Sequence, residues 1–126
     1  MNTTERNKIH WDKKNKFFQK NILQGLVPTN GIDARIQFFT EKDFEQVIER
    51  VIEFGSGVAL YGIEIFDGDE YLDNLVYEEF KNATGPDDET WLRSAFAQLK
   101  EVAYKNKAKM QFHYSATYHV PEALLA

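Results

Sequence analysis

The clearest pattern of apolar and polar positions lies between residues 40 and 57. Apolar side chains recur there at the i, i+3, i+4, i+7, i+8 spacing of one helix face, namely Phe44, Val47, Ile48, Val51 and Ile52. Thr40 followed by Asp43 is a variant of the capping box. Gly55-Ser56-Gly57 is a typical end signal. The pattern therefore predicts a helix that starts after Thr40 and ends before Gly55.

Three further segments share this helical spacing. Residues 4–24 carry an imperfect apolar face that ends at Gly25 and Pro28. A second helix is expected over Glu70–Lys81, with the apolar stripe Leu72, Leu75, Val76 and Phe80. A third begins at Asp87 and has the stripe Trp91, Leu92, Ala95, Phe96, Leu99, Val102 and Ala103.

Other segments show the composition or alternation of strands. Ile32–Phe39 is short and rich in β-favouring residues. Val58–Phe66 is apolar on both alternating faces, which is typical of a central strand. Lys109–Tyr118 alternates strictly and is expected to lie at an edge or to face solvent on one side.

The predicted order is therefore α-β-α-β-α-α-β. It indicates the α/β class, with a small three-stranded sheet flanked by about four helices. A strand, a helix and a second strand in succession predict a right-handed parallel crossover. The length of 126 residues fits a single globular domain over residues 1–126.

Composition removes several kinds of chemistry. The chain has no Cys, so thiol catalysis and cysteine-based metal sites are excluded. It contains no phosphate-binding loop and no G-x-S-x-G elbow. We expect no metal and no cofactor. The polar first residues lack the apolar core of a signal peptide, and no apolar stretch is long enough to cross a membrane. A cytoplasmic protein with no membrane partner is therefore expected.

Charge is distributed unevenly along the chain. The net charge is −5, yet residues 41–90 hold fifteen Asp and Glu against three Lys and Arg, a net −12. Residues 1–20 and 91–110 are each net +4. An acidic centre argues against nucleic-acid binding and favours a basic protein partner.

The predicted helix over Glu70–Lys81 concentrates this acidity. Its outward face would carry carboxylates and one tyrosine, a side chain that often anchors interfaces. The candidate binding residues, including two from the preceding turn, are Asp67, Asp69, Glu70, Asp73, Tyr77 and Glu78. A second acidic ridge, Glu45, Glu49 and Glu53, lies on the Thr40 helix. Like charges at that spacing mildly oppose helix formation.

Residues 58–118, read as a strand, an acidic helix, a second helix and a last strand, resemble barstar and related toxin-neutralising immunity proteins. That group includes the immunity proteins of contact-dependent growth inhibition. The resemblance implies a cytoplasmic inhibitor, not an enzyme, whose acidic surface covers the basic active site of a cognate toxin, and a nuclease is the expected kind of toxin. Glu70, Asp73 and Tyr77 would face the toxin by analogy.

Two alternatives stay open. Glu64 and His113 would form an acid–base dyad if their strands pair with both side chains on one face, which would make the protein a small enzyme. A regulatory interaction module would use the same acidic face without inhibiting a toxin.

Overall fold

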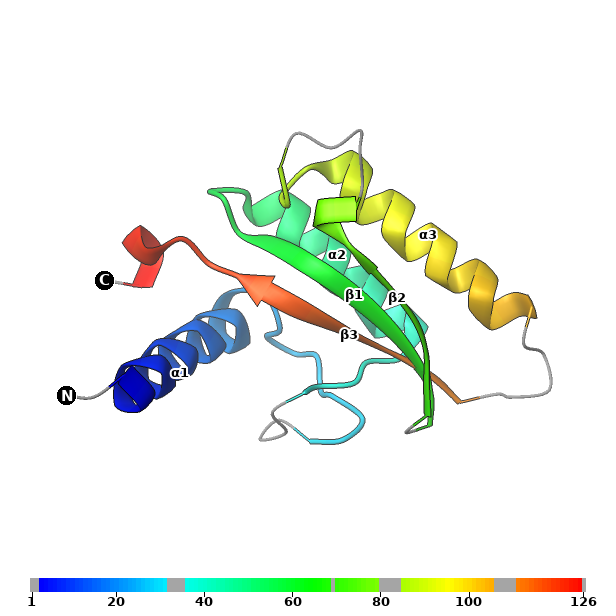
Figure 1. The fold of residues 1–126 in the computed structure, drawn as a ribbon, viewed down its shortest axis with the longest axis horizontal. Helices are drawn as coiled ribbons and strands as arrows, with labels where there is room; N and C mark the ends of the chain where they lie inside the picture. The colour runs from blue at the N-terminus through cyan, green and yellow to red at the C-terminus, as the bar shows by residue number, and fades with distance from the viewer. Residues whose placement is uncertain (1–2, 32–35, 69, 80–84, 106–110, 126) are drawn as a thin grey trace.

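The computed structural model describes residues 3–31, 36–68, 70–79, 85–105 and 111–125, whose arrangement is drawn in Figure 1. These residues form, in chain order, α1 (Thr3–Asn21), α2 (Glu41–Phe54), β1 (Ala59–Asp67), β2 (Glu70–Val76), the 3-10 turn η1 (Tyr77–Glu79), α3 (Glu89–Lys105), β3 (Phe112–His119) and the 3-10 turn η2 (Glu122–Leu125). The α/β class and the three-stranded sheet are confirmed.

The sheet has the strand order β2-β1-β3, and β1 is antiparallel to both neighbours. Asp67 lies opposite Glu70, so a two-residue loop joins β1 to β2. Gly68 opens this loop at a φ of 59°, and hairpin turns of this length require a positive φ at that position. The central place of β1 and the edge position of β3 are confirmed. Phe39 bridges β3 in the antiparallel sense and β3 is antiparallel to β1, so the chain at Phe39 runs parallel to β1, as the predicted crossover requires.

The segment Glu70–Lys81 is the main error of the sequence prediction, because residues 70–76 form strand β2 instead of a helix. The register explains the misleading pattern. Phe66 pairs with Tyr71 and Ile65 with Asp73, which leaves Leu72 as an extra, bulged residue. The bulge lets Leu72 and Leu75 both pack against the core although they are three positions apart. Two strand residues thus reproduce the spacing of a helix face.

In the described half of the predicted strand Ile32–Phe39, the chain forms one β-bridge and no longer strand. Residues 32–35 lie outside the described residues. Of the remainder, Phe39 makes an isolated antiparallel bridge to Tyr114. This bridge has two backbone hydrogen bonds, of 2.9 and 2.8 Å, and it covers part of the outer edge of β3.

Helices α2 and α3 pack on one face of the sheet, which we call the core face (Ile63, Ile65 and Tyr114) (Figure 1). The predicted stripe of α2 is confirmed, with four residues buried and Ile52 partly buried. The Thr40 side chain accepts a hydrogen bond from the Asp43 N–H, as the capping pattern predicts. The α3 stripe is buried as well, apart from a partly buried Val102.

The opposite face of the sheet, which we call the polar face, carries Glu64, Phe66, His113 and Ser115. Near β3 it is bordered by α1 and by the chain that follows α1 (Figure 1). Phe38 packs there on Phe66 and His113, with ring centroids 4.7 and 5.9 Å apart.

Aromatic contacts and hydrogen bonds hold α1 in place. Phe18 stacks on Tyr118 of β3 at a centroid distance of 4.2 Å. The Arg50 guanidinium of α2 donates to the carbonyls of Ile22 and Gln24, which fixes the end of α1 against α2. The helix predicted over residues 4–24 is thereby confirmed over 3–21.

Candidate protein-binding surface

Strand β2 forms one edge of the sheet, with β1 on its inner side. In the described part of the chain no strand pairs with its outer side. An edge strand presents free backbone groups and exposed side chains to solvent. We call the exposed residues of this strand and of η1 the β2 surface: Glu70, Tyr71, Asp73, Asn74 and Glu78.

The residues predicted as a binding site do lie in this region, but along a strand and not on a helix face. Asp67 and Glu70 face each other at the loop end of the hairpin. Tyr77 and Glu78 lie in η1 at the other end, about 20 Å away for a strand of this length. Asp69 lies outside the described residues.

Asp73 lies midway between these two ends and is exposed. It pairs with Ile65 and so points to the side of the sheet that α3 covers. There it lines a small hollow together with Gln98, Glu101 and Lys105 of α3. The predicted acidic site is therefore divided between the two ends of β2 and the α3 side.

The aromatic anchor of the surface differs from the prediction. Tyr77 packs edge-to-face on the buried Trp91, at a centroid distance of 6.1 Å, and belongs to the edge of the core. Tyr71 is the exposed tyrosine, at 52% of its maximal area. Its hydroxyl donates to Asn74 Oδ1 at 2.7 Å, and its ring packs edge-on against Phe66. A Gly-Asp pair flanked by strand-like residues is the hairpin signal that would have identified Tyr71 as a strand residue.

The charge of the hairpin is of one sign. Residues 59–79 contain seven Asp and Glu and no Lys or Arg. Partial burial and the nearby carboxylates of Asp73 and Glu64 raise the pKa of the Tyr71 phenol. The surface is therefore an acidic strand with one exposed aromatic ring.

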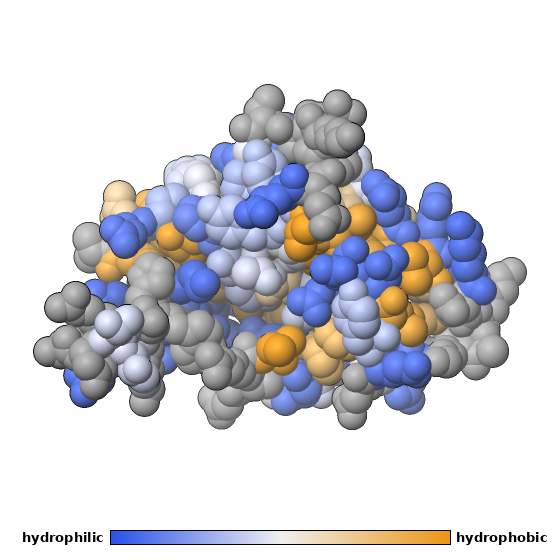
Figure 2. All heavy atoms as spheres, in the orientation of Figure 1, coloured by the Kyte–Doolittle hydropathy of each residue, from blue (hydrophilic) through white to orange (hydrophobic). Residues whose placement is uncertain are grey.

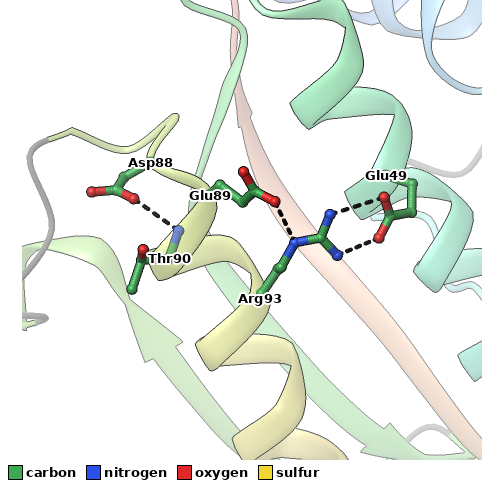
Figure 3. A network of polar contacts seen from close by, with 5 residues as sticks. All are labelled: Glu49, Asp88, Glu89, Thr90 and Arg93. Atoms are coloured by element: carbon green, nitrogen blue, oxygen red, sulfur yellow. Dashed lines mark hydrogen bonds and ion pairs between the residues drawn. The ribbon is translucent and has the colours of Figure 1, made fainter.

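The second acidic ridge, on α2, has a structural explanation. Arg93 of α3 binds both carboxylate oxygens of Glu49 and also Glu89, as Figure 3 shows. The hydrogen bond from Arg93 lowers the pKa of the Glu49 carboxyl. The ridge thus serves in part to join α2 to α3, while Glu45 and Glu53 remain exposed.

Glu64 and His113 lie on the same face of neighbouring strands, and they are two positions apart in the strand register. Glu64 is opposite Ser115, and His113 is opposite Phe66. His113 Nδ1 lies 3.4 Å from the Gly68 carbonyl oxygen, and its ring stacks on Phe38. The imidazole is therefore held by the hairpin loop and an aromatic ring instead of by Glu64.

The described residues contain no group of three His, Asp or Glu side chains positioned to hold a metal ion. None of the described helices combines the length and the apolar character needed to cross a membrane. Comparison with family models, curated proteins and solved structures gives no significant match.

Proposed function

We propose that this protein is an immunity protein that binds and neutralises a basic toxin domain through the β2 surface. A nuclease is the favoured toxin, since such an enzyme needs a cationic site to bind a phosphate backbone. The observation that carries the proposal is the exposed edge strand whose hairpin bears seven carboxylates and no cation.

The composition of the surface fits a partner recognised by charge. In Figure 2 apolar side chains lie in separate patches divided by hydrophilic residues. Such a surface favours recognition through charge and hydrogen bonds over a broad apolar contact. Tyr71 supplies contact area at a small cost in side-chain entropy, and its hydrogen bond to Asn74 already restrains it.

Inhibition would follow from coverage of the active site. The carboxylates distributed along β2 would attract a cationic cleft, speed the encounter and make it sensitive to salt. Once docked, the same carboxylates would occupy positions that substrate phosphates otherwise take. The proposal relies on charge and exposure, because the acidic helix of the immunity-protein resemblance is strand β2 in this fold.

An enzyme using Glu64 and His113 is a weaker proposal. General acid–base catalysis requires the proton donor and acceptor to reach the same substrate atom. His113 instead stacks on Phe38 and turns one ring nitrogen to the Gly68 carbonyl. A regulatory module would share the β2 surface and would differ by binding its partner without blocking toxicity.

The test uses a cationic toxin domain encoded by a neighbouring gene, which the proposal expects to exist. In the double variant Asp73→Lys/Glu78→Lys, two exposed carboxylates become cations. We expect its affinity for the toxin to fall about a hundredfold, since like charges then face each other. In cells that co-express the toxin, the variant is expected to lose protection.

The matched control is Glu45→Lys/Glu53→Lys, which reverses two exposed carboxylates on α2. It changes the net charge by the same amount and is expected to keep affinity and protection. Equal losses of affinity in the two double variants would show that net charge alone drives binding. Unchanged binding by the β2 pair would refute the surface assignment, and binding without protection would favour a regulatory module.

A further inference from the structure

A cavity lies on the polar face of the sheet, and Glu64 of its lining lies opposite Asn74 of the β2 surface in the strand register. Its volume is about 290 Å³, close to the lower limit for small-molecule sites. The walls come from three parts of the chain: α1, the segment at residues 36–37 and the strands β1 and β3. The polar side chains that line it are Lys14, Asn15, Gln37, Glu64, Ser115 and Thr117.

Two opposite charges face this cavity without neutralising each other. Lys14 and Glu64 are both partly buried, and they form no ion pair within the 4.0 Å limit among the described residues. Burial lowers the pKa of the Lys14 ammonium, with no carboxylate opposing that shift. Removing a charge from water is costly unless a partner compensates it. The Lys14 nitrogen and the Glu64 oxygens are more than 4.0 Å apart, and both side chains border the same cavity.

Hydroxyl and amide groups complete the walls. Ser115 lies opposite Glu64 in the register, so its side chain is on the same face. Thr117 lies two residues further along β3 on this face, and Asn15 follows Lys14 on α1. Such groups orient a polar ligand by hydrogen bonds. Lys14 and Glu64 would each attract the end of the ligand that carries the opposite charge.

We infer that this cavity binds a small zwitterion, specifically a free α-amino acid, with its carboxylate at Lys14 and its ammonium group at Glu64. An anion without an ammonium group would be repelled by Glu64, and a cation without a carboxylate by Lys14. An amino acid satisfies both charges, and its compact size suits the volume. This inference is independent of the proposed toxin binding.

The test is calorimetric titration of the wild-type protein with each of the twenty amino acids at millimolar concentration. For each amino acid that binds, the amine without the carboxylate and the acid without the amine are titrated in turn. We expect at least one amino acid to bind and both truncated analogues to bind at least about tenfold more weakly. Amide NMR signals of Ser115 and Thr117 are expected to shift on binding.

Lys14→Met and Glu64→Gln each remove one charge while keeping the side-chain volume nearly constant. Each is expected to weaken binding at least about tenfold. Lys13→Met, on an exposed position of the same helix, is the matched control and is expected to bind as the wild type does. Circular dichroism checks that each variant is folded. The inference is overturned if no amino acid binds, if both charge variants bind normally, or if the analogues bind as well as the zwitterion.

Discussion

Helix α3 and strand β2 flank the same central strand, yet they contribute differently to the molecule. Six residues of α3 are buried, whereas no residue of β2 is fully buried. α3 is held by packing against the sheet and by the Arg93 contacts to Glu49 and Glu89. β2 is held by a neighbouring strand on one side only, and its charged residues, Glu70 and Asp73, are both acidic and exposed. The difference indicates that α3 determines stability and that β2 is free to serve recognition.

The sharpest test of this comparison is Trp91→Ala. Trp91 is fully buried, and its indole Nε1 donates to the Leu60 carbonyl at 2.9 Å. Truncation opens a large cavity and leaves that carbonyl without its donor. We expect the free energy of unfolding to fall by about 3–5 kcal/mol, measured by urea denaturation.

The matched change on β2 is Tyr71→Ala, which removes an exposed aromatic ring. It is expected to cost about 1 kcal/mol or less. Similar losses for Trp91→Ala and Tyr71→Ala would contradict the division between a stabilising α3 and a permissive β2.

The turns that precede and follow β1 are expected to show effects smaller than that of Trp91→Ala. Gly57 has a φ of 84°, and an added Cβ would lie 2.9 Å from Cγ of Pro121. Gly57→Ala is therefore expected to lower the free energy of unfolding by about 2 kcal/mol, through backbone strain and crowding together.

Gly68 offers the control at the β2 end of the same strand. Its φ of 59° is also positive, but an added Cβ would meet nothing within 4 Å. Gly68→Ala is expected to cost about 1 kcal/mol, the strain component alone. Thermal and urea unfolding of the two variants separate crowding from strain, and equal losses would show that Pro121 does not constrain the turn.

The smallest expected effect concerns the link between α2 and α3. The folded-state pKa of Glu49 is lowered by Arg93, so this carboxylate stabilises the fold above its ordinary pKa of 4.5. That contribution is lost as the pH falls through the lowered folded-state value. Glu49→Gln should therefore be slightly less stable than the wild type at pH 7 and equal to it in strong acid. A stability difference that did not change with pH would point to packing instead of charge.

Much of the fold could be predicted from the sequence where one signal dominates. Thr40, the stripe from Phe44 to Val51 and the Gly55 stop agree, and α2 forms within a residue or two of the expected bounds. The alternation ending at Tyr118 likewise gives β3. In these segments the buried residues recur at a regular spacing, and α2 also has a capping residue and a stop. The secondary structure therefore follows from residues close together in the sequence.

β2 could not be predicted in this way, because its pattern depends on pairing with β1. The bulge at Leu72 is a property of the strand pair and is invisible in a single segment. The predicted site and the β2 surface therefore share one stretch of sequence, but the predicted tyrosine, Tyr77, packs at the edge of the core, and Tyr71 is the exposed one. The cavity between Lys14 and Glu64 joins residues fifty positions apart, which only the folded chain brings together.

The isolated bridge between Phe39 and Tyr114 has a consequence for stoichiometry. It occupies the middle of the outer edge of β3 at Tyr114, so a long added strand cannot pair along that edge without displacing Phe39. β2 is then the edge through which this sheet can be extended. Within the described residues β2 is the one strand edge without any bridge, so a single strand is expected to add there. Complexes formed by strand addition would therefore stop at two chains and would not extend into fibres.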